Sequence, residues 1–130
     1  MQRVKKIGLI FICAFLGSAL RLSLTAWTTP HHYLTILTIN VIGSFGLPLI
    51  TGALPLLWPV SPAMVTGLSV GLVGSFTTFS TFTVDAVSLL HQHAAWLAGG
   101  YVLGSLVFGW SAAAAGITLS ARLVKRGRRA

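Results

Sequence analysis

The sequence predicts an all-α integral membrane protein, built as one four-span domain over residues 1–130. Its 130 residues are 55% hydrophobic and only 8% charged, whereas soluble domains carry roughly 25% charged residues. Four apolar segments, at about residues 7–27, 33–54, 63–90 and 94–123, each reach the roughly 20 residues that a helix needs to cross a bilayer. We therefore expect a multi-pass protein of the plasma (cell) membrane, surrounded by lipid.

The positions of the charges predict the orientation of the chain. The sequence has nine Lys and Arg and a single acid, giving a formal net charge of +8. Basic residues beside apolar spans stay on the cytoplasmic side and contact anionic headgroups, so we expect lipid and not nucleic acid as the partner. The flanking bases are Arg3, Lys5, Lys6, Arg122, Lys125, Arg126, Arg128 and Arg129. The turns expected on the opposite side hold no Lys or Arg, only four His, which predicts that both termini are cytoplasmic.

The first two spans each carry a polar side chain at an apolar site. Arg21 is the only base within a span, where it costs at least about 2.5–3.5 kcal/mol on insertion scales. It either snorkels to the interface or faces an aqueous vestibule and attracts anions. Asn40, in the second span, either joins two helices or donates its amide N–H to a passing anion. Pro48, which lacks an N–H, is expected to bend the second helix.

The third segment is nearly 30 residues long and has the densest polar content. Residues 71–85 contain six Ser or Thr and the only acid, Asp85, which lies toward one end of the span. The glycines Gly71 and Gly74, followed by hydroxyl residues, predict a helix broken near its middle. Freed carbonyls and helix ends at such breaks bind ions. The hydroxyls either bond back to the carbonyl four residues earlier or form part of such a site.

Aromatic and small residues complete the pattern. Phe79 and Phe82 are three residues apart and share a helix face. They either pack in the core or present their positive ring edges to an anion. Small residues in the fourth span, from Gly100 to Gly116, allow close helix contact. The sequence shows no catalytic Ser/His/Asp set, no paired carboxylates and no Cys/His metal spacing, so we do not expect an enzyme.

The third segment resembles the CrcB/Fluc family of fluoride channels. The resemblance rests on the stretch GLVGSFTTFSTF, with GSALR around Arg21 and TINVIGSF around Asn40, and it covers nearly the whole chain. It implies an antiparallel dimer of four-helix subunits with two pores, which passively exports cytoplasmic fluoride. Neutral donors and ring edges would replace the water around the ion, since a strong cationic site would trap it.

The resemblance also implies roles for individual residues. By position, the fluoride path is lined by Asn40, Phe79, Ser80, Thr81, Phe82 and Ser105. Arg21 matches a vestibule arginine. The main-chain carbonyls of Gly74 and Thr77, two from each subunit, match those that hold a structural sodium ion (Na+) at the dimer centre. Asp85 stands where the family usually has Glu, and Cys13 and Ala14 where paired glycines are common.

The charge bias and the resemblance leave alternatives open. A chain that inserts in both orientations should show little Lys/Arg asymmetry, but this one has eight flanking bases on one side and none on the other. We therefore favour an inverted heterodimer with a paralogous subunit over an inverted homodimer. The alternative functions are a small proton-coupled multidrug exporter of the four-span type, which needs a carboxylate that the first span lacks, and a non-conducting assembly factor.

Overall fold

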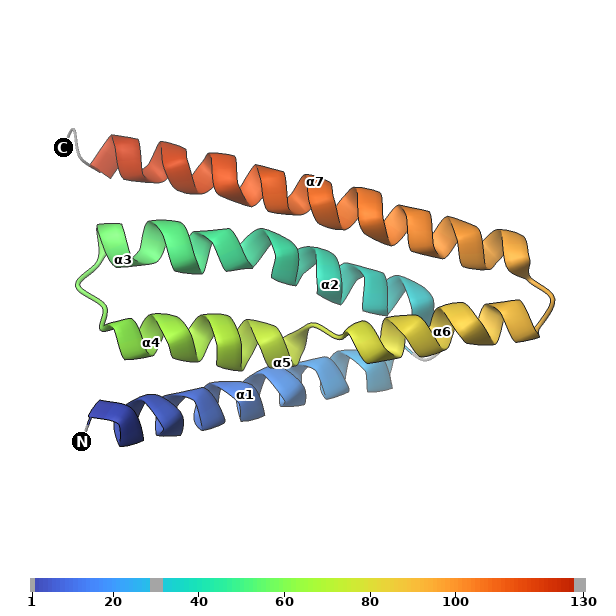
Figure 1. Ribbon diagram of the computed structural model, residues 1–130, viewed down its shortest axis with the longest axis horizontal. Helices are drawn as coiled ribbons and strands as arrows, with labels where there is room; N and C mark the ends of the chain where they lie inside the picture. The colour runs from blue at the N-terminus through green and yellow to red at the C-terminus, as the bar shows by residue number, and fades with distance from the viewer. Residues whose placement is uncertain (1, 29–31, 128–130) are drawn as a thin grey trace.

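The computed structural model describes residues 2–28 and 32–127, and this part of the chain forms four long helical spans lying side by side (Figure 1). The spans are Arg3–Trp27, His32–Leu57, Pro62–His91 and Ala95–Gly127, each long and apolar enough to cross a membrane. The predicted all-α, four-span fold is thereby confirmed. The first turn, with residues 29–31, and the last two arginines lie outside the described residues.

The first and fourth spans are continuous α-helices. They are α1 (Gln2–Trp27) and α7 (Ala95–Gly127), and neither contains proline. The turn that leads into α7 holds the one non-glycine residue with positive φ among those described, His93 at 57°, whose N–H donates to the Leu90 carbonyl at 3.0 Å. The chain thus reverses sharply, and both ends of the described chain lie at the same end of the molecule (Figure 1).

The second span changes its helix type at Pro48. Helix α2 (His32–Pro48) passes into the π-helical segment η2 (Leu49–Ala53) and then into the short α3 (Leu54–Leu57). Proline has no N–H for the i→i−4 bond, which weakens the α-helical ladder at this point. The π-helical pattern begins at the next residue, so the helix widens directly after Pro48, whereas the bend expected there stays a prediction.

The third span is divided into four segments. These are α4 (Pro62–Thr66), the π-helical η3 (Gly67–Val73), α5 (Gly74–Phe76) and α6 (Phe79–His91). Between α5 and α6 the backbone is extended, with φ/ψ of −73°/159° at Thr77 and −148°/123° at Thr78. The break expected at Gly71 and Gly74 therefore lies three residues further on. The helix continues through Gly71, and the break begins at Thr77, one of the two residues that the family resemblance places at the ion-binding break.

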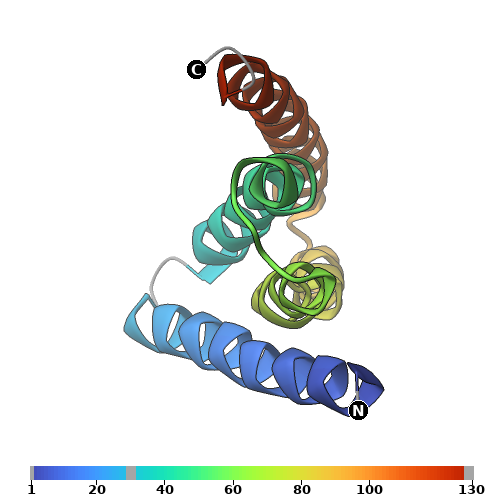
Figure 2. The same cartoon turned by 90° about the vertical axis from the view of Figure 1, so that its left-hand side faces the viewer.

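At Gly71, the absence of a side chain allows the first and third spans to approach closely. A Cβ on Gly71 would lie 2.7 Å from the Ile10 carbonyl oxygen and 2.9 Å from the Cβ of Cys13, so only hydrogen fits. Helix α1 accordingly packs along η3 and α5, while α2 and η2 pack along α7 (Figure 2). Of the small residues expected to bring the fourth span close to its neighbours, Gly116 does so against the Phe45 carbonyl, whereas Gly100 has no atom within 4 Å of its missing Cβ.

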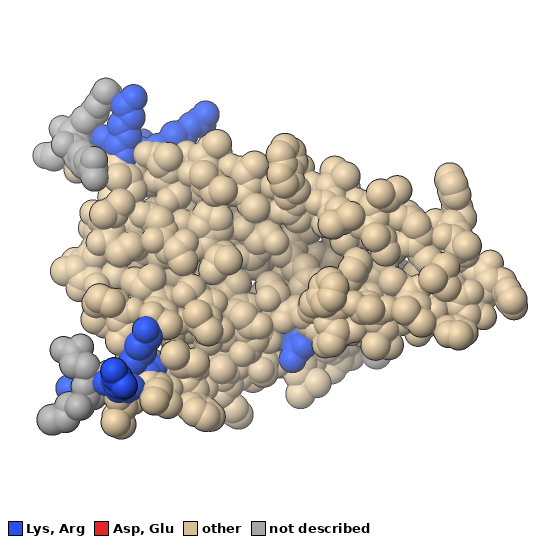
Figure 3. Space-filling view, in the orientation of Figure 1, with Lys and Arg blue, Asp and Glu red and all other residues tan. Residues whose placement is uncertain are grey.

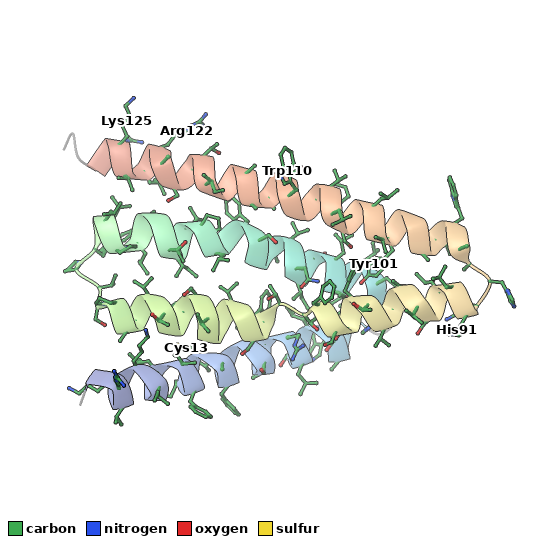
Figure 4. The ribbon with its side chains drawn as sticks, in the orientation of Figure 1. Cys13, His91, Tyr101, Trp110, Arg122 and Lys125 are labelled. Carbon is green, nitrogen blue, oxygen red and sulfur yellow. The ribbon has the colours of Figure 1, made fainter. Side chains whose placement is uncertain are left out.

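The outer surface is apolar, as expected for a chain whose solvent is lipid. Only a few side chains are fully enclosed, Ile36 and Ile39 most completely at 1% exposure, while large side chains such as Phe11 and Trp110 are exposed. The Lys and Arg side chains gather mainly at the end where the termini lie (Figure 3). On α7, Arg122 and Lys125 point outward from the bundle (Figure 4). The molecule thus has a basic end and a long apolar body.

Candidate functional site

The break in the third span is held by the side chain of Asn40. The Thr78 N–H donates to Asn40 Oδ1 at 2.9 Å, and Asn40 Nδ2 donates to the Thr78 carbonyl at 3.0 Å. The amide of Asn40 thus replaces the helical partner of the Thr78 N–H, which lipid could not supply. It also adds a second bond to the Thr78 carbonyl, which as the N-cap of α6 already accepts the first bond of that helix. One N–H of the amide is used in this way and the second remains for another acceptor.

A cluster of hydroxyl groups begins α6. Thr78 is 6% exposed, and its Oγ1 accepts a hydrogen bond from the Thr81 N–H at 3.2 Å, which caps the helix. The Thr78 hydroxyl donates to Thr81 Oγ1 at 3.0 Å and lies 3.4 Å from Ser80 Oγ. In this arrangement the hydroxyl hydrogen of Thr81 is not used in either bond. The two predicted hydroxyl residues, Ser80 and Thr81, are therefore brought together with Asn40 through Thr78.

Two backbone carbonyls lose their usual helical partners at the break. In a continuous helix the Gly74 carbonyl accepts from the N–H of residue 78, and the Thr77 carbonyl from that of residue 81. Here the Thr78 N–H donates to Asn40, and the Thr81 N–H donates to the Thr78 hydroxyl. Unwound carbonyls of this kind coordinate sodium in other membrane proteins. The donors at Gly74 and Thr77 are hard, neutral oxygens and so fit the predicted ion.

An aromatic row lies beside the hydroxyl cluster. The rings of Phe79 and Phe82 have centroids 5.9 Å apart, and those of Phe82 and Tyr101 5.1 Å apart. Tyr101 lies between α7 and α6 (Figure 4) and also packs edge-on against Tyr33 at 5.7 Å. Phe79 is 79% exposed. The structure thus places the two predicted phenylalanines together, and adds a tyrosine that the sequence pattern did not single out.

The single acid lies inside the bundle rather than at its edge. Asp85 is 7% exposed, its Oδ1 lies 3.4 Å from His32 Nε2, and it accepts a hydrogen bond from the Tyr101 hydroxyl at 3.5 Å. The position of Asp85 toward one end of the span is compatible with an interfacial depth, and the structure adds that its carboxylate is enclosed by neighbouring helices. A buried tyrosine usually finds a partner for its hydroxyl, and here that partner is Asp85.

Two cavities adjoin the break. The first, of about 290 Å³, is lined by Asn40, Gly43, Thr77, Thr78 and Phe79 among others. The second, of about 340 Å³, is lined by Ser18, Arg21, Leu22, Thr25, His32, Ile36 and Thr81. We call the second the arginine cavity. Because Thr78 lines one cavity and its bonded neighbour Thr81 lines the other, the hydroxyl cluster lies between them.

Ser105 has an unusual environment. It lies four residues after Tyr101 on α7 and hence on the same helix face. Its Oγ is buried and has no hydrogen-bond partner within residues 2–28 and 32–127. An unsatisfied buried hydroxyl costs about 1–3 kcal/mol. The Ser105 hydroxyl can therefore donate to an acceptor that the described residues do not provide.

These features define a class of protein. The chain is a small multi-pass membrane protein in which neutral donors, aromatic rings and freed carbonyls meet at an interrupted helix, next to a cavity that contains an arginine. Such an arrangement is suited to accepting ions within the bilayer.

The chain belongs to the CrcB family. Residues 8–117 match the family model described as CrcB-like protein, Camphor Resistance (CrcB). It is 46% identical over 118 residues to a protein of Lactiplantibacillus plantarum named fluoride-specific ion channel FluC 2, covering 90% of this chain and 93% of that one. It is 37% identical over 123 residues to FluC 1 of Bacillus cereus, covering 91% and 85%. It is 34% identical over 121 residues to FluC of Agrobacterium fabrum, covering 90% and 97%.

Proposed function

We propose that this chain is a subunit of a fluoride-specific ion channel that passively exports cytoplasmic fluoride and so relieves fluoride toxicity. Relatives that match it over most of their length carry that name. The observation that carries the proposal is the hydroxyl cluster at the third-span break, which Asn40 holds beside the Phe79–Phe82 pair.

The chemistry of the site suits a small, tightly hydrated anion. Dehydrating fluoride is costly, and the pore must return that energy through neutral hydrogen bonds and ring edges. The free N–H of Asn40, the unused hydroxyl hydrogen of Thr81 and the unpartnered Ser105 hydroxyl are donors of this kind. Several weak sites allow the ion to leave as readily as it binds. Arg21, at the arginine cavity, would attract the anion to this mouth of the path without holding it along the path.

We further propose that the channel is an antiparallel dimer with a structural sodium ion at its centre. Four carbonyls, from Gly74 and Thr77 of each subunit, would surround the ion and tie the two breaks together. In support, the exposed ring of Phe79 and the exposed Ser80 lie on the surface of a single subunit, where a second subunit would cover them. The ion would be structural and would not be transported.

The charge bias supports a heterodimer with a paralogous subunit of opposite orientation. The basic end holds the flanking Lys and Arg of the described residues, which supports a cytoplasmic position for both termini. A homodimer would require the same chain to insert in both orientations, that is, dual topology. Expression of this chain alone, with a C-terminal tag probed from each face of the membrane, tests this. Robust fluoride efflux with tags on both faces would refute the heterodimer.

A liposome experiment tests the function itself. Purified protein, alone and with candidate paralogous subunits, is reconstituted into liposomes loaded with potassium fluoride, and fluoride loss is followed with a fluoride electrode. We expect fluoride loss without a proton gradient, and its abolition by Phe82→Ile, which removes the ring between Phe79 and Tyr101. Phe11→Ile, at a side chain that is 73% exposed on α1, is the matched control. Retention of fluoride by every combination would refute the proposal.

The same experiment separates the alternative, a small proton-coupled multidrug exporter. Such a protein needs a carboxylate in its first span, and α1 has none. The buried acid of this chain is Asp85, which lies on α6 and is paired with His32 and Tyr101. Fluoride flux that requires a proton gradient, or a gradient-driven loss of a cationic dye, would favour the exporter.

A further inference from the structure

A groove runs between the second span and α7, toward the basic end of the molecule. It is a cavity of about 640 Å³, lined from the second span by residues of α2, η2 and α3 and from α7 by its last turns. Along α7 it extends from Ile117 to Lys125, a rise of about 12 Å. We call it the η2–α7 groove. It shares no lining residue with the two cavities at the break, so it is separate from the proposed fluoride path.

The η2–α7 groove has a narrow floor and apolar walls. A Cβ on Gly52 would lie 2.6 Å from Ser120 Oγ, so η2 and α7 meet closely at the floor. On the walls, Leu56 is 61% exposed and Ile117 is 59% exposed. An apolar surface with nothing packed against it loses its van der Waals contacts on that side. In a bilayer the neighbouring molecules are lipids, and an acyl chain is the part of a lipid that fits an apolar groove.

The charge at one end of the groove determines which headgroup fits. Lys125 lines the groove at the basic end, and its side chain extends outward from α7 (Figure 4). Arg122 and Arg126 lie close to it in the last turns of the same helix. The only acid of the sequence, Asp85, belongs to α6 and does not line the groove. Since a lysine stem covers apolar surface while its ammonium contacts an anion, this end of the groove is complementary to a headgroup with a net negative charge.

Ser120 adds a polar group beneath the charged end. It is 7% exposed, and its hydroxyl makes no hydrogen bond within residues 2–28 and 32–127. It precedes Lys125 by about one and a half turns of α7. In a phospholipid the ester carbonyls lie just below the phosphate, on the side of the acyl chains. Ser120 is therefore placed to donate to an ester carbonyl of a lipid whose phosphate is at Lys125.

We infer that the η2–α7 groove binds one anionic phospholipid, with an acyl chain between Leu56 and Ile117 and the headgroup at Lys125. This is more than the general attraction of a basic surface for anionic headgroups, because it assigns one lipid molecule to one groove. The basic end is the end that we propose to face the cytoplasm, and the cytoplasmic leaflet carries a negative surface potential. The inference does not depend on which ion the protein conducts.

Native mass spectrometry of the purified full-length protein in detergent tests the headgroup. The protein is titrated with phosphatidylglycerol or with phosphatidylcholine of identical acyl chains, and the first lipid retained by each subunit is counted. We expect phosphatidylglycerol to bind about fivefold more tightly, the effect of one lysine near an anionic headgroup. Lys125→Gln should remove most of this preference. Arg126→Gln is the matched control, because it removes the same charge from the next residue, which does not line the groove, and it should keep the preference.

A second pair of variants tests the groove itself. Ala121 lines the groove and is exposed, so Ala121→Trp should fill the space and abolish retention of the first lipid of either kind. Ala115→Trp is the matched control, since Ala115 is exposed on the same helix but does not line the groove. Elution of each variant as one symmetric peak shows that it has folded.

Three results would overturn the inference. The first is equal retention of the two lipids by the wild-type protein, and the second is unchanged lipid retention in Ala121→Trp. The third is a shift from dimer to monomer in Ala121→Trp but not in Ala115→Trp, which would show that a partner subunit covers the groove. Because none of these measurements uses fluoride, failure of the proposed function would leave the lipid site standing, and failure of the lipid site would leave the proposed function standing.

Discussion

Removal of the Asn40 amide should open the break in the third span. In Asn40→Ala, the Thr78 N–H loses its partner, and Thr78 is only 6% exposed. The Thr78 carbonyl loses one of two bonds, because as the N-cap of α6 it also accepts the first bond of that helix. A buried group left unpaired costs about 1–3 kcal/mol, which is the loss of stability expected for this variant. That is a large part of the stability of a typical domain. The variant should also lose most of its fluoride efflux, since the hydroxyl cluster depends on the position of Thr78.

Amide hydrogen exchange measures this cost directly. Because 1.4 kcal/mol is a factor of ten, loss of the bond at the Thr78 N–H alone should speed exchange there by roughly 5- to 150-fold. Asn40→Asp should be intermediate, since its carboxylate still accepts from the N–H but no longer donates to the carbonyl. Thr38→Ala is the matched control on the same helix, because its hydroxyl bonds only to the exposed Leu34 carbonyl at 2.8 Å. Unchanged exchange and full efflux in Asn40→Ala would refute the assignment of Asn40 as the support of the break.

Three further predictions concern the cap, a close helix contact and the ion. Thr78→Val keeps the side-chain shape but removes the cap of α6, and should lower thermal stability by about 1 kcal/mol. The control Thr83→Val removes an exposed bond within the helix and should change thermal stability little. Equal losses of stability in the two variants would contradict the capping role of Thr78. Gly71→Ala forces a methyl group against an α1 carbonyl 2.7 Å away and should cost about 1–3 kcal/mol in thermal unfolding, whereas Gly46→Ala, with nothing within 4 Å, should be neutral or stabilising. Replacement of sodium by N-methylglucamine on both sides of the membrane should slow fluoride efflux and shift the proposed dimer toward monomer on size exclusion. Equal efflux and equal elution in the two cations would count against a sodium site at the Gly74 and Thr77 carbonyls.

The four spans were predictable from the sequence because apolar length alone identifies them. The long run that contains residues 71–85 also showed that the third span could not be one regular helix within the bilayer. The position of the break was not predictable in the same way. It depends on Asn40, which lies 38 residues away and replaces the helical partner of the Thr78 N–H. Glycine in the sequence indicated flexibility, but at Gly71 its small size serves helix contact instead.

The candidate site was predictable in part. The spacing of Phe79 and Phe82 places them on one face, and the structure brings their rings together. The partners of Asp85 were not apparent, because they come from the start of α2 and from α7, and neither is close to it in the sequence. Its distance from the centre of the span therefore suggested an interfacial position, and contact with Tyr101 and His32 also encloses it.

The bonds that Asn40 makes to Thr78 have a consequence for assembly. Because these groups are satisfied within one chain, each subunit can complete its kinked span before it meets another. In the dimer that we propose, association would then be a docking of two folded subunits and not a joint folding reaction. A single subunit in the bilayer would keep its break intact while it diffuses to a partner of opposite orientation.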